Sequence, residues 1–111
     1  MKVLKFSHLY TKIDDLQSGQ TITTIRRRLK GIQINDCIYV KLNNRYLCIA
    51  KIVKIEKKKL KDISTDLLKK DTDKKTRQEA VQLLNSFYRN KITEDEELFI
   101  FYLKKKDVFI I

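Results

Sequence analysis

Apolar residues occur in short runs, alternating or continuous, that predict strands at both ends of the chain and in its middle. Two of these strands form a hairpin joined at Asn43 and Asn44, because asparagine tolerates the positive φ that a tight turn requires. Near the C-terminus, a continuous apolar run is typical of a buried strand. The predicted strands comprise Val3 to Phe6, Cys37–Leu42, and residues 46–55, 98–103 and 108–111.

A further strand is predicted over residues 21–28, where β-branched side chains dominate. Strict alternation would place Ile22 and Ile25 on opposite faces of this strand. The pattern indicates either a bulge or a strand that is covered on both sides. A short helix over residues 10–18 precedes the strand, with Gly19 as its left-handed cap.

Two helices are predicted between the hairpin and the C-terminal strands. Ser64 or Thr65 can cap a short first helix, and Thr76 with Glu79 forms a capping box for a longer second one. The apolar face of the second helix comprises Ala80, Leu84, Phe87 and Tyr88. Residues 57–90 are therefore predicted to leave the sheet as one helical excursion.

The whole chain, residues 1–111, is predicted to form a single α+β domain. Five or six strands with two or three helices favour a small, mixed β-barrel with a two-helix insertion. The absence of proline and the presence of only two glycines leave little flexible loop. The lysine run at residues 104–106 is interpreted as a solvated turn between two strands.

Charge narrows the functional class. The 25 basic and 14 acidic residues give a formal net charge of +11, which favours a polyanionic partner. Most of the cations are scattered lysines, but Arg26, Arg27 and Arg28 are adjacent and follow a threonine-rich segment. A guanidinium is planar and forks onto phosphate or a base edge, and neighbouring hydroxyls can bind phosphate oxygens. We predict a nucleic-acid site here, for RNA before DNA.

The sequence does not indicate a membrane protein, a secreted protein or a metalloprotein. The chain has no run of about 18 apolar residues, and its N-terminus carries Lys2 and Lys5, so neither a membrane span nor a signal peptide is predicted. Cys37 and Cys48 lie in strand-like segments, with only His8 as a further soft ligand. We predict no metal or cofactor and two buried free thiols in a cytoplasmic protein, with a disulfide between neighbouring strands as the alternative. The pattern does not predict an oligomeric state.

The segment from Gly19 to Arg26, Gly-Gln-Thr-Ile-Thr-Thr-Ile-Arg, resembles the Gly-x-Lys-x-x-Glu-x-Arg signature of the ASCH domain, a member of the PUA-like superfamily. Gly19 and Arg26 match in place, Thr21 stands where lysine is usual, and Thr24 stands where glutamate or threonine occurs. Asn-Asp before the hairpin and Ser-Phe-Tyr-Arg after the helices add to the resemblance, which spans residues 4–101. It implies a PUA-like fold that binds RNA in a cleft beside the signature strand.

The resemblance also implies an alternative. Some small ASCH proteins are amidohydrolases of acylated cytidine-type nucleosides, and their threonine and acid would correspond to Thr24 and Asp71. Their lysine corresponds to Thr21, which cannot replace an amine in activating a hydroxyl nucleophile. We therefore favour a non-enzymatic module, and keep a hydrolase or nuclease as the alternative if Lys30 or Lys70 reaches the pocket. An interaction module for an acidic protein is a third hypothesis.

Structural roles compete with binding roles at several positions. Arg26 could pair with Asp36 or another carboxylate of the cleft. Among the tyrosines that could stack on unpaired bases, Tyr10, Tyr39 and Tyr46, the last is expected to be exposed beside the hairpin turn. Phe87, Phe99 and Phe101 are expected in the core. The predicted nucleic-acid-binding residues are Thr21, Thr23, Thr24, Arg26, Arg27, Arg28, Lys30, Arg45 and Tyr46.

Overall fold

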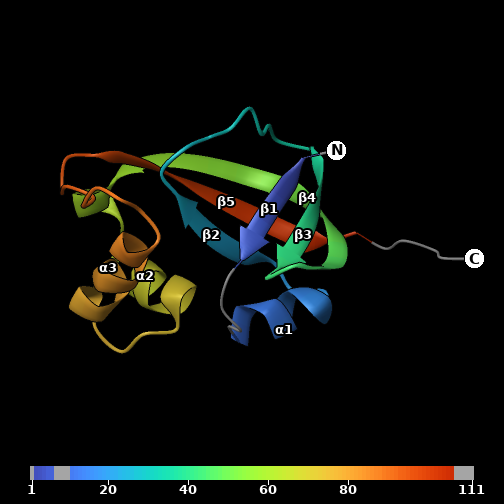
Figure 1. Cartoon of the computed structure of the whole chain (residues 1–111), viewed down its shortest axis with the longest axis horizontal. Helices are drawn as coiled ribbons and strands as arrows, with labels where there is room; N and C mark the ends of the chain where they lie inside the picture. The colour runs from blue at the N-terminus through green and yellow to red at the C-terminus, as the bar shows by residue number, and fades with distance from the viewer. Residues whose placement is uncertain (1, 7–10, 107–111) are drawn as a thin grey trace, which may run out of the picture.

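A curled five-stranded sheet forms the centre of the computed structural model, which describes residues 2–6 and 11–106 (Figure 1). The strand order is β1-β3-β4-β5-β2, so β1 and β2 are the two edges. β1 pairs with β3 in parallel, and the other neighbours are antiparallel. The strands are β1 (Val3–Phe6), β2 (Ile22–Arg26), β3 (Cys37–Leu42), β4 (Arg45–Lys59) and β5 (Glu97–Lys105).

The helices lie in two places around the sheet. The short α1 (Thr11–Gln17) lies beside one end of the sheet, whereas α2 (Thr65–Thr72) and α3 (Arg77–Ser86) lie together beyond β2 (Figure 1). A 3-10 turn, Leu60–Asp62, connects β4 to α2. The predicted caps are confirmed, because Ser64 Oγ accepts from Leu67 N at 3.1 Å and Thr76 Oγ1 accepts from Glu79 N at 3.1 Å.

Strand β2 is shared between two hydrophobic cores. Ile22 packs in the first core, which α1 covers, and Ile25 packs in the second, with residues of α2 and α3. The pairing of β2 with β5 is regular from Ile22 opposite Leu103 to Arg26 opposite Phe99. Of the two alternatives for this strand, coverage on both sides is therefore correct.

The α+β class and the barrel-like sheet are confirmed, but three local predictions are wrong. β4 continues to Lys59, so the helical excursion starts later than residue 57, because the strand keeps pairing with β5 as far as Glu97. Lys104 and Lys105 belong to β5 rather than to a turn, because they pair with β4. Phe87 is 43% exposed instead of lying in the core, whereas Phe101 is fully buried as predicted and Phe99 packs, half-buried, against the first core.

The predicted turn and the predicted glycine cap are both present. Asn43 adopts a φ of 54° and Gly19 a φ of 96°, as the predicted turn and helix cap require. Cys37 and Cys48 are both free as predicted, but they are half-buried rather than buried. The predicted strand at residues 108–111, His8 and Tyr10 lie outside the described residues. None of the helices within residues 2–6 and 11–106 is long and apolar enough to cross a membrane.

Candidate nucleic-acid interface

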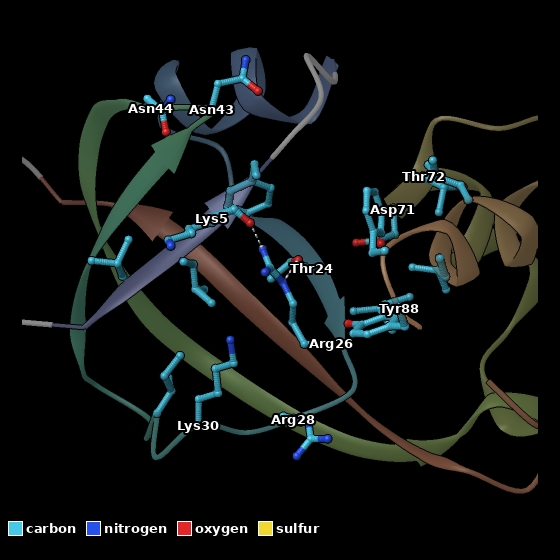
Figure 2. A pocket seen from close by; sticks show the side chains of 18 residues that line it. Lys5, Thr24, Arg26, Arg28, Lys30, Asn43, Asn44, Asp71, Thr72 and Tyr88 are labelled. Atoms are coloured by element: carbon cyan, nitrogen blue, oxygen red, sulfur yellow. Dashed lines mark hydrogen bonds between the residues drawn. The ribbon is translucent and has the colours of Figure 1, made fainter. Parts of the chain in front are cut away.

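A pocket of about 770 Å³ lies between the two edges of the sheet and the helices α2 and α3. Arg28 and Lys30 lie at one end of it and Asn43 and Asn44 at the other, with Asp71 on the helical side (Figure 2). Its lining comprises Val3, Leu4, Lys5, Phe6, Thr24, Ile25, Arg26, Arg28, Lys30, Ile32, Asn43, Asn44, Asp71, Thr72, Leu83, Leu84, Phe87 and Tyr88. The pocket therefore combines apolar walls with cations from several elements.

Arg26 spans the gap between the two edge strands. Its Nη2 donates to the backbone carbonyl of Lys5 on β1 at 2.8 Å, and its Nε donates to Thr24 Oγ1 at 2.9 Å (Figure 2). The guanidinium carbon also lies 4.9 Å from the centre of the Phe6 ring. Asp36, the acid considered for Arg26, instead accepts from Lys2 Nζ at 2.9 Å and from a backbone amide, which together hold its pKa below the usual range.

Arg27 does not line the pocket but belongs to a network that includes the lining residue Tyr88. Both oxygens of Glu96 accept from its guanidinium, which also donates to the carbonyl of Asn90 at 2.7 Å. The guanidinium carbon lies 5.4 Å from the centre of the Tyr88 ring, and the Tyr88 hydroxyl accepts from the Arg27 backbone amide. The hydrogen bond from Arg27 holds the pKa of Glu96 below its ordinary value. Arg27 therefore fastens β2 to the segment before β5.

Three cations at the pocket have no ion-pair partner among the described residues, although the charge of Arg28 contributes to lowering the pKa of Glu96. Within residues 2–6 and 11–106, no carboxylate lies within ion-pair distance of Lys5, Arg28 or Lys30. All three side chains are exposed. Lys30 has a φ of 53°, so the backbone turns at this residue immediately before Gly31. These cations are available to an anionic ligand.

Buried polar groups from β2 and α2 line the pocket. Thr24, Asp71 and Thr72 are the buried polar residues of the described chain, and all three line this pocket. Thr23 Oγ1 donates to Asp71 Oδ1 at 2.9 Å, which joins β2 to α2. Thr72 Oγ1 donates to the Leu68 carbonyl at 2.7 Å, within α2. The Asp71 carboxylate therefore has at least one structural partner.

The remaining predicted site residues are distributed differently. Thr21 is exposed ahead of β2, and Lys70 is exposed on α2; both lie outside the lining. Arg45 and Tyr46 lie at the start of β4, also outside the lining, and Tyr46 is exposed as predicted. The structure thus gathers Thr24, Arg26, Arg28, Lys30 and Asp71 and leaves Thr21, Arg27, Arg45 and Tyr46 elsewhere; Thr23 contributes through Asp71.

Sequence reasoning missed several lining residues. Lys5 lines the pocket because β1 curls toward β2. Asn43 and Asn44 line it from the hairpin turn, for which the sequence predicted no binding role. Phe87 and Tyr88 follow the apolar pattern of α3, but α3 ends at Ser86, and both side chains line the pocket. The alternation of Lys5 with Leu4 and Phe6 was the available signal for a cation at this strand.

No protein family model matches the chain. The chain is 37% identical over 114 residues to the uncharacterized protein MJ0364 of Methanocaldococcus jannaschii, with 92% of this chain and 94% of the other covered. The chain belongs to the family of that protein. This membership extends over nearly the full length of both sequences.

Two solved structures share the fold. Protein EF3133 from Enterococcus faecalis V583, described by the family model DUF984, has a TM-score of 0.68 at 14% identity, with 96% of this chain and 77% of that chain covered. The ASCH domain from Lactobacillus crispatus JV V101 has a TM-score of 0.61 at 15% identity, with 94% and 79% covered. This family member therefore has the ASCH-type fold, which confirms the predicted resemblance at the level of the fold.

Proposed function

We propose that this protein binds nucleic acid, RNA in preference to DNA, and that the pocket between β1 and β2 receives an unpaired nucleotide. The observation that carries the proposal is the set of exposed cations, Lys5, Arg28 and Lys30, around a pocket with apolar and aromatic walls. The ASCH-type fold supports an RNA-binding type of module. The two free thiols agree with a reducing compartment, so we propose the cytoplasm as its location.

Each part of the pocket has a chemical role in this proposal. The guanidinium of Arg28 and the ammonium groups of Lys5 and Lys30 neutralise phosphates. The rings of Phe87 and Tyr88 offer surfaces against which an unpaired base packs. Arg26 connects the edge strands β1 and β2 and so keeps the pocket open to a width that a nucleotide can enter. Arg27 holds β2 in place and does not contact the ligand.

Binding of a labelled single-stranded RNA, measured by fluorescence anisotropy over a range of salt concentrations, tests this proposal. Each phosphate contact that is lost should flatten the slope of log affinity against log salt by about 0.7. Arg28→Ala and Lys30→Ala should each flatten it. Lys59→Ala, a matched control, removes an exposed cation at the far end of β4 and should leave the slope unchanged.

Two results would contradict the proposal. Equal slopes for Arg28→Ala, Lys30→Ala and the wild type would show that the pocket cations do not contact the RNA. Absence of binding to RNA and DNA at low salt would favour the third hypothesis, in which these cations bind carboxylates of an acidic protein.

A hydrolase is the second candidate, because Thr24 and Asp71 line the same pocket as two lysines, Lys5 and Lys30. Arg26 Nε donates to Thr24 Oγ1, an arrangement that stabilises an ionised hydroxyl. Incubation with N4-acylated cytidine and with labelled RNA tests it. Product that forms with the wild type and disappears with Thr24→Val would establish catalysis, and absence of product from both substrates would exclude these two reactions.

A further inference from the structure

The outer face of β1, β3 and the first half of β4 carries a second set of cations and aromatic rings. Inward side chains of β3, such as Val40, are buried, while Tyr39 is exposed and Lys41 half-buried. The register places Lys5 beside Lys41, and Lys41 beside Tyr46, in one row across three strands. Since neighbouring strands lie about 5 Å apart, this row is continuous from the pocket edge to β4.

A bulge brings Tyr46 to this face. Pairing between β3 and β4 is regular as far as Val40 opposite Cys48, and the next pair is Lys41 opposite Tyr46. The extra residue, Leu47, packs with Cys48 against the first core, so Tyr46 points outward where strict alternation would have turned it inward. Its ring contacts that of Tyr39 edge-on, with centroids 5.3 Å apart. Tyr46 remains 62% exposed despite this contact.

Lysines lie directly opposite each other in this part of the sheet, where their like charges repel. Lys5 lies opposite Lys41, and Lys51 lies opposite Lys104 of the neighbouring β5, although like charges directly opposite each other in a sheet are destabilising. Val3–Phe6, Cys37–Leu42 and residues 45–51 contain no aspartate or glutamate. Among the ion pairs of the described residues, none involves these four lysines.

The second half of β4 shows the contrast. There Lys54 and Lys58 both lie within ion-pair distance of Glu56, and Lys57 lies within ion-pair distance of Glu97. The same strand therefore balances its lysines at one end and leaves Lys51 without a carboxylate at the other. The lysines of the outer face therefore lack carboxylates to balance their charge, and an anionic partner would supply this balance.

We propose that the outer face of β1, β3 and β4 binds the part of a single-stranded RNA that flanks the nucleotide in the pocket. Lys5 lines the pocket and begins the row, so the backbone crosses the β1 edge there and continues over Lys41 toward Lys51 and Lys104. The exposed ring of Tyr46 provides a stacking surface for one unpaired base. Lys41 Nζ, 5.1 Å from the centre of that ring, lies close enough to contact the adjoining phosphate. This inference rests on the proposed RNA-binding function and extends it.

The test compares two fluorescein-labelled oligouridylates, of about 4 and about 16 nucleotides, which bracket the lengths bound by small single-strand-binding folds. The longer one should bind the wild type more tightly. Tyr46→Ala should weaken binding of the longer one by about tenfold, the usual loss for one stacked base, and leave the shorter one unchanged. Tyr46→Phe keeps the ring and should bind both like the wild type. Lys51→Ala should flatten the salt dependence for the longer RNA only.

The two proposals fail in different ways. If Arg28→Ala weakens both RNAs while Tyr46→Ala and Lys51→Ala weaken neither, the outer-face inference is overturned and the pocket proposal stands. If the wild type binds neither RNA, the proposed function itself fails. Poly-L-glutamate provides a probe without bases: an equal loss of its binding in Tyr46→Ala would overturn the stacking role. Because Tyr46 is mostly exposed, a thermal unfolding curve should confirm that each variant is folded.

Discussion

Arg26 Nη2 donates to the backbone carbonyl of Lys5 at 2.8 Å and so connects the two edges of the sheet. β1 and β2 are at opposite ends of the strand order, so no backbone ladder joins them in the described structure. The same guanidinium donates to Thr24 Oγ1, on the wall of the pocket. One side chain therefore sets the separation of the edges and orients a hydroxyl inside the pocket.

Arg26→Ala should lower the free energy of unfolding by about 2 kcal/mol, because it removes hydrogen bonds from a charged donor and leaves their acceptors. Arg26→Lys should recover little of this, since an ammonium cannot reproduce the fork of a guanidinium. Urea unfolding followed by circular dichroism measures both. An exposed cation two residues away gives the control: Arg28→Ala should stay within about 0.5 kcal/mol of the wild type. Equal losses at the two positions would contradict this division of roles.

Local signals in the sequence predicted local structure well. The Asn43-Asn44 turn and the caps at Ser64 and Thr76 depend on neighbouring residues, and each is present as expected. Local signals could not predict that Arg27 binds a carboxylate whereas Arg28 is exposed at the pocket. This difference depends on Glu96, which lies 69 residues from Arg27 along the chain and meets it only once β2 and β5 are paired.

The pocket was predictable only in part for the same reason. The segment that contains Thr24 and Arg26 could be recognised from a family resemblance, but Lys5 enters the pocket through the curl of the sheet. Phe87 continues the apolar period of α3 and was therefore assigned to the core. Phe87 follows directly after α3, and it lines the pocket together with Leu83 and Leu84 of that helix, so this side of α3 borders the pocket as well as the core.

The Glu96 carboxyl should make the stability of the protein depend on pH. The hydrogen bond from Arg27 lowers its pKa below the ordinary 4.5 in the folded state, so its contribution is present above that value and is lost as pH falls through the folded pKa. Glu96→Gln should therefore destabilise at about pH 7 and have a much smaller effect at about pH 2. Urea unfolding at both pH values measures the difference. A destabilisation that is the same at both would show that the charge is not responsible.

Tyr102 should titrate at unusually high pH. Burial, together with its hydrogen bond to Glu56, raises its pKa to about 12, from an ordinary 10.0. The folded state retains this proton where the unfolded chain releases it, so stability should fall as pH rises through that interval. Tyrosinate absorbance as a function of pH should show a late step from one of the five tyrosines. Tyr102→Phe should remove the step, and Glu56→Gln should move it to lower pH; a step unchanged in either variant would contradict the assignment.

Alanine substitutions of Phe87 and Leu84 should affect different properties, RNA affinity in the first case and stability in the second. Both line the pocket, but Leu84 is 3% exposed and packs in the second core, whereas Phe87 is 43% exposed. Leu84→Ala should therefore cost about 2–5 kcal/mol of unfolding free energy through the cavity that it leaves. Phe87→Ala should cost about 1 kcal/mol or less and weaken RNA binding by about tenfold, because a stacking surface is lost.

Val53→Ala is the matched control for Phe87→Ala, since Val53 is an apolar side chain of similar exposure, 41%, that lies outside the pocket lining. It should leave RNA affinity unchanged. Fluorescence anisotropy with the longer oligouridylate measures RNA affinity, and urea unfolding measures stability. Both are applied to Phe87→Ala, Leu84→Ala and Val53→Ala. Wild-type affinity in Phe87→Ala would remove this ring from the binding site. Equal weakening in Val53→Ala would show that the loss does not come from the pocket, because that side chain does not reach it.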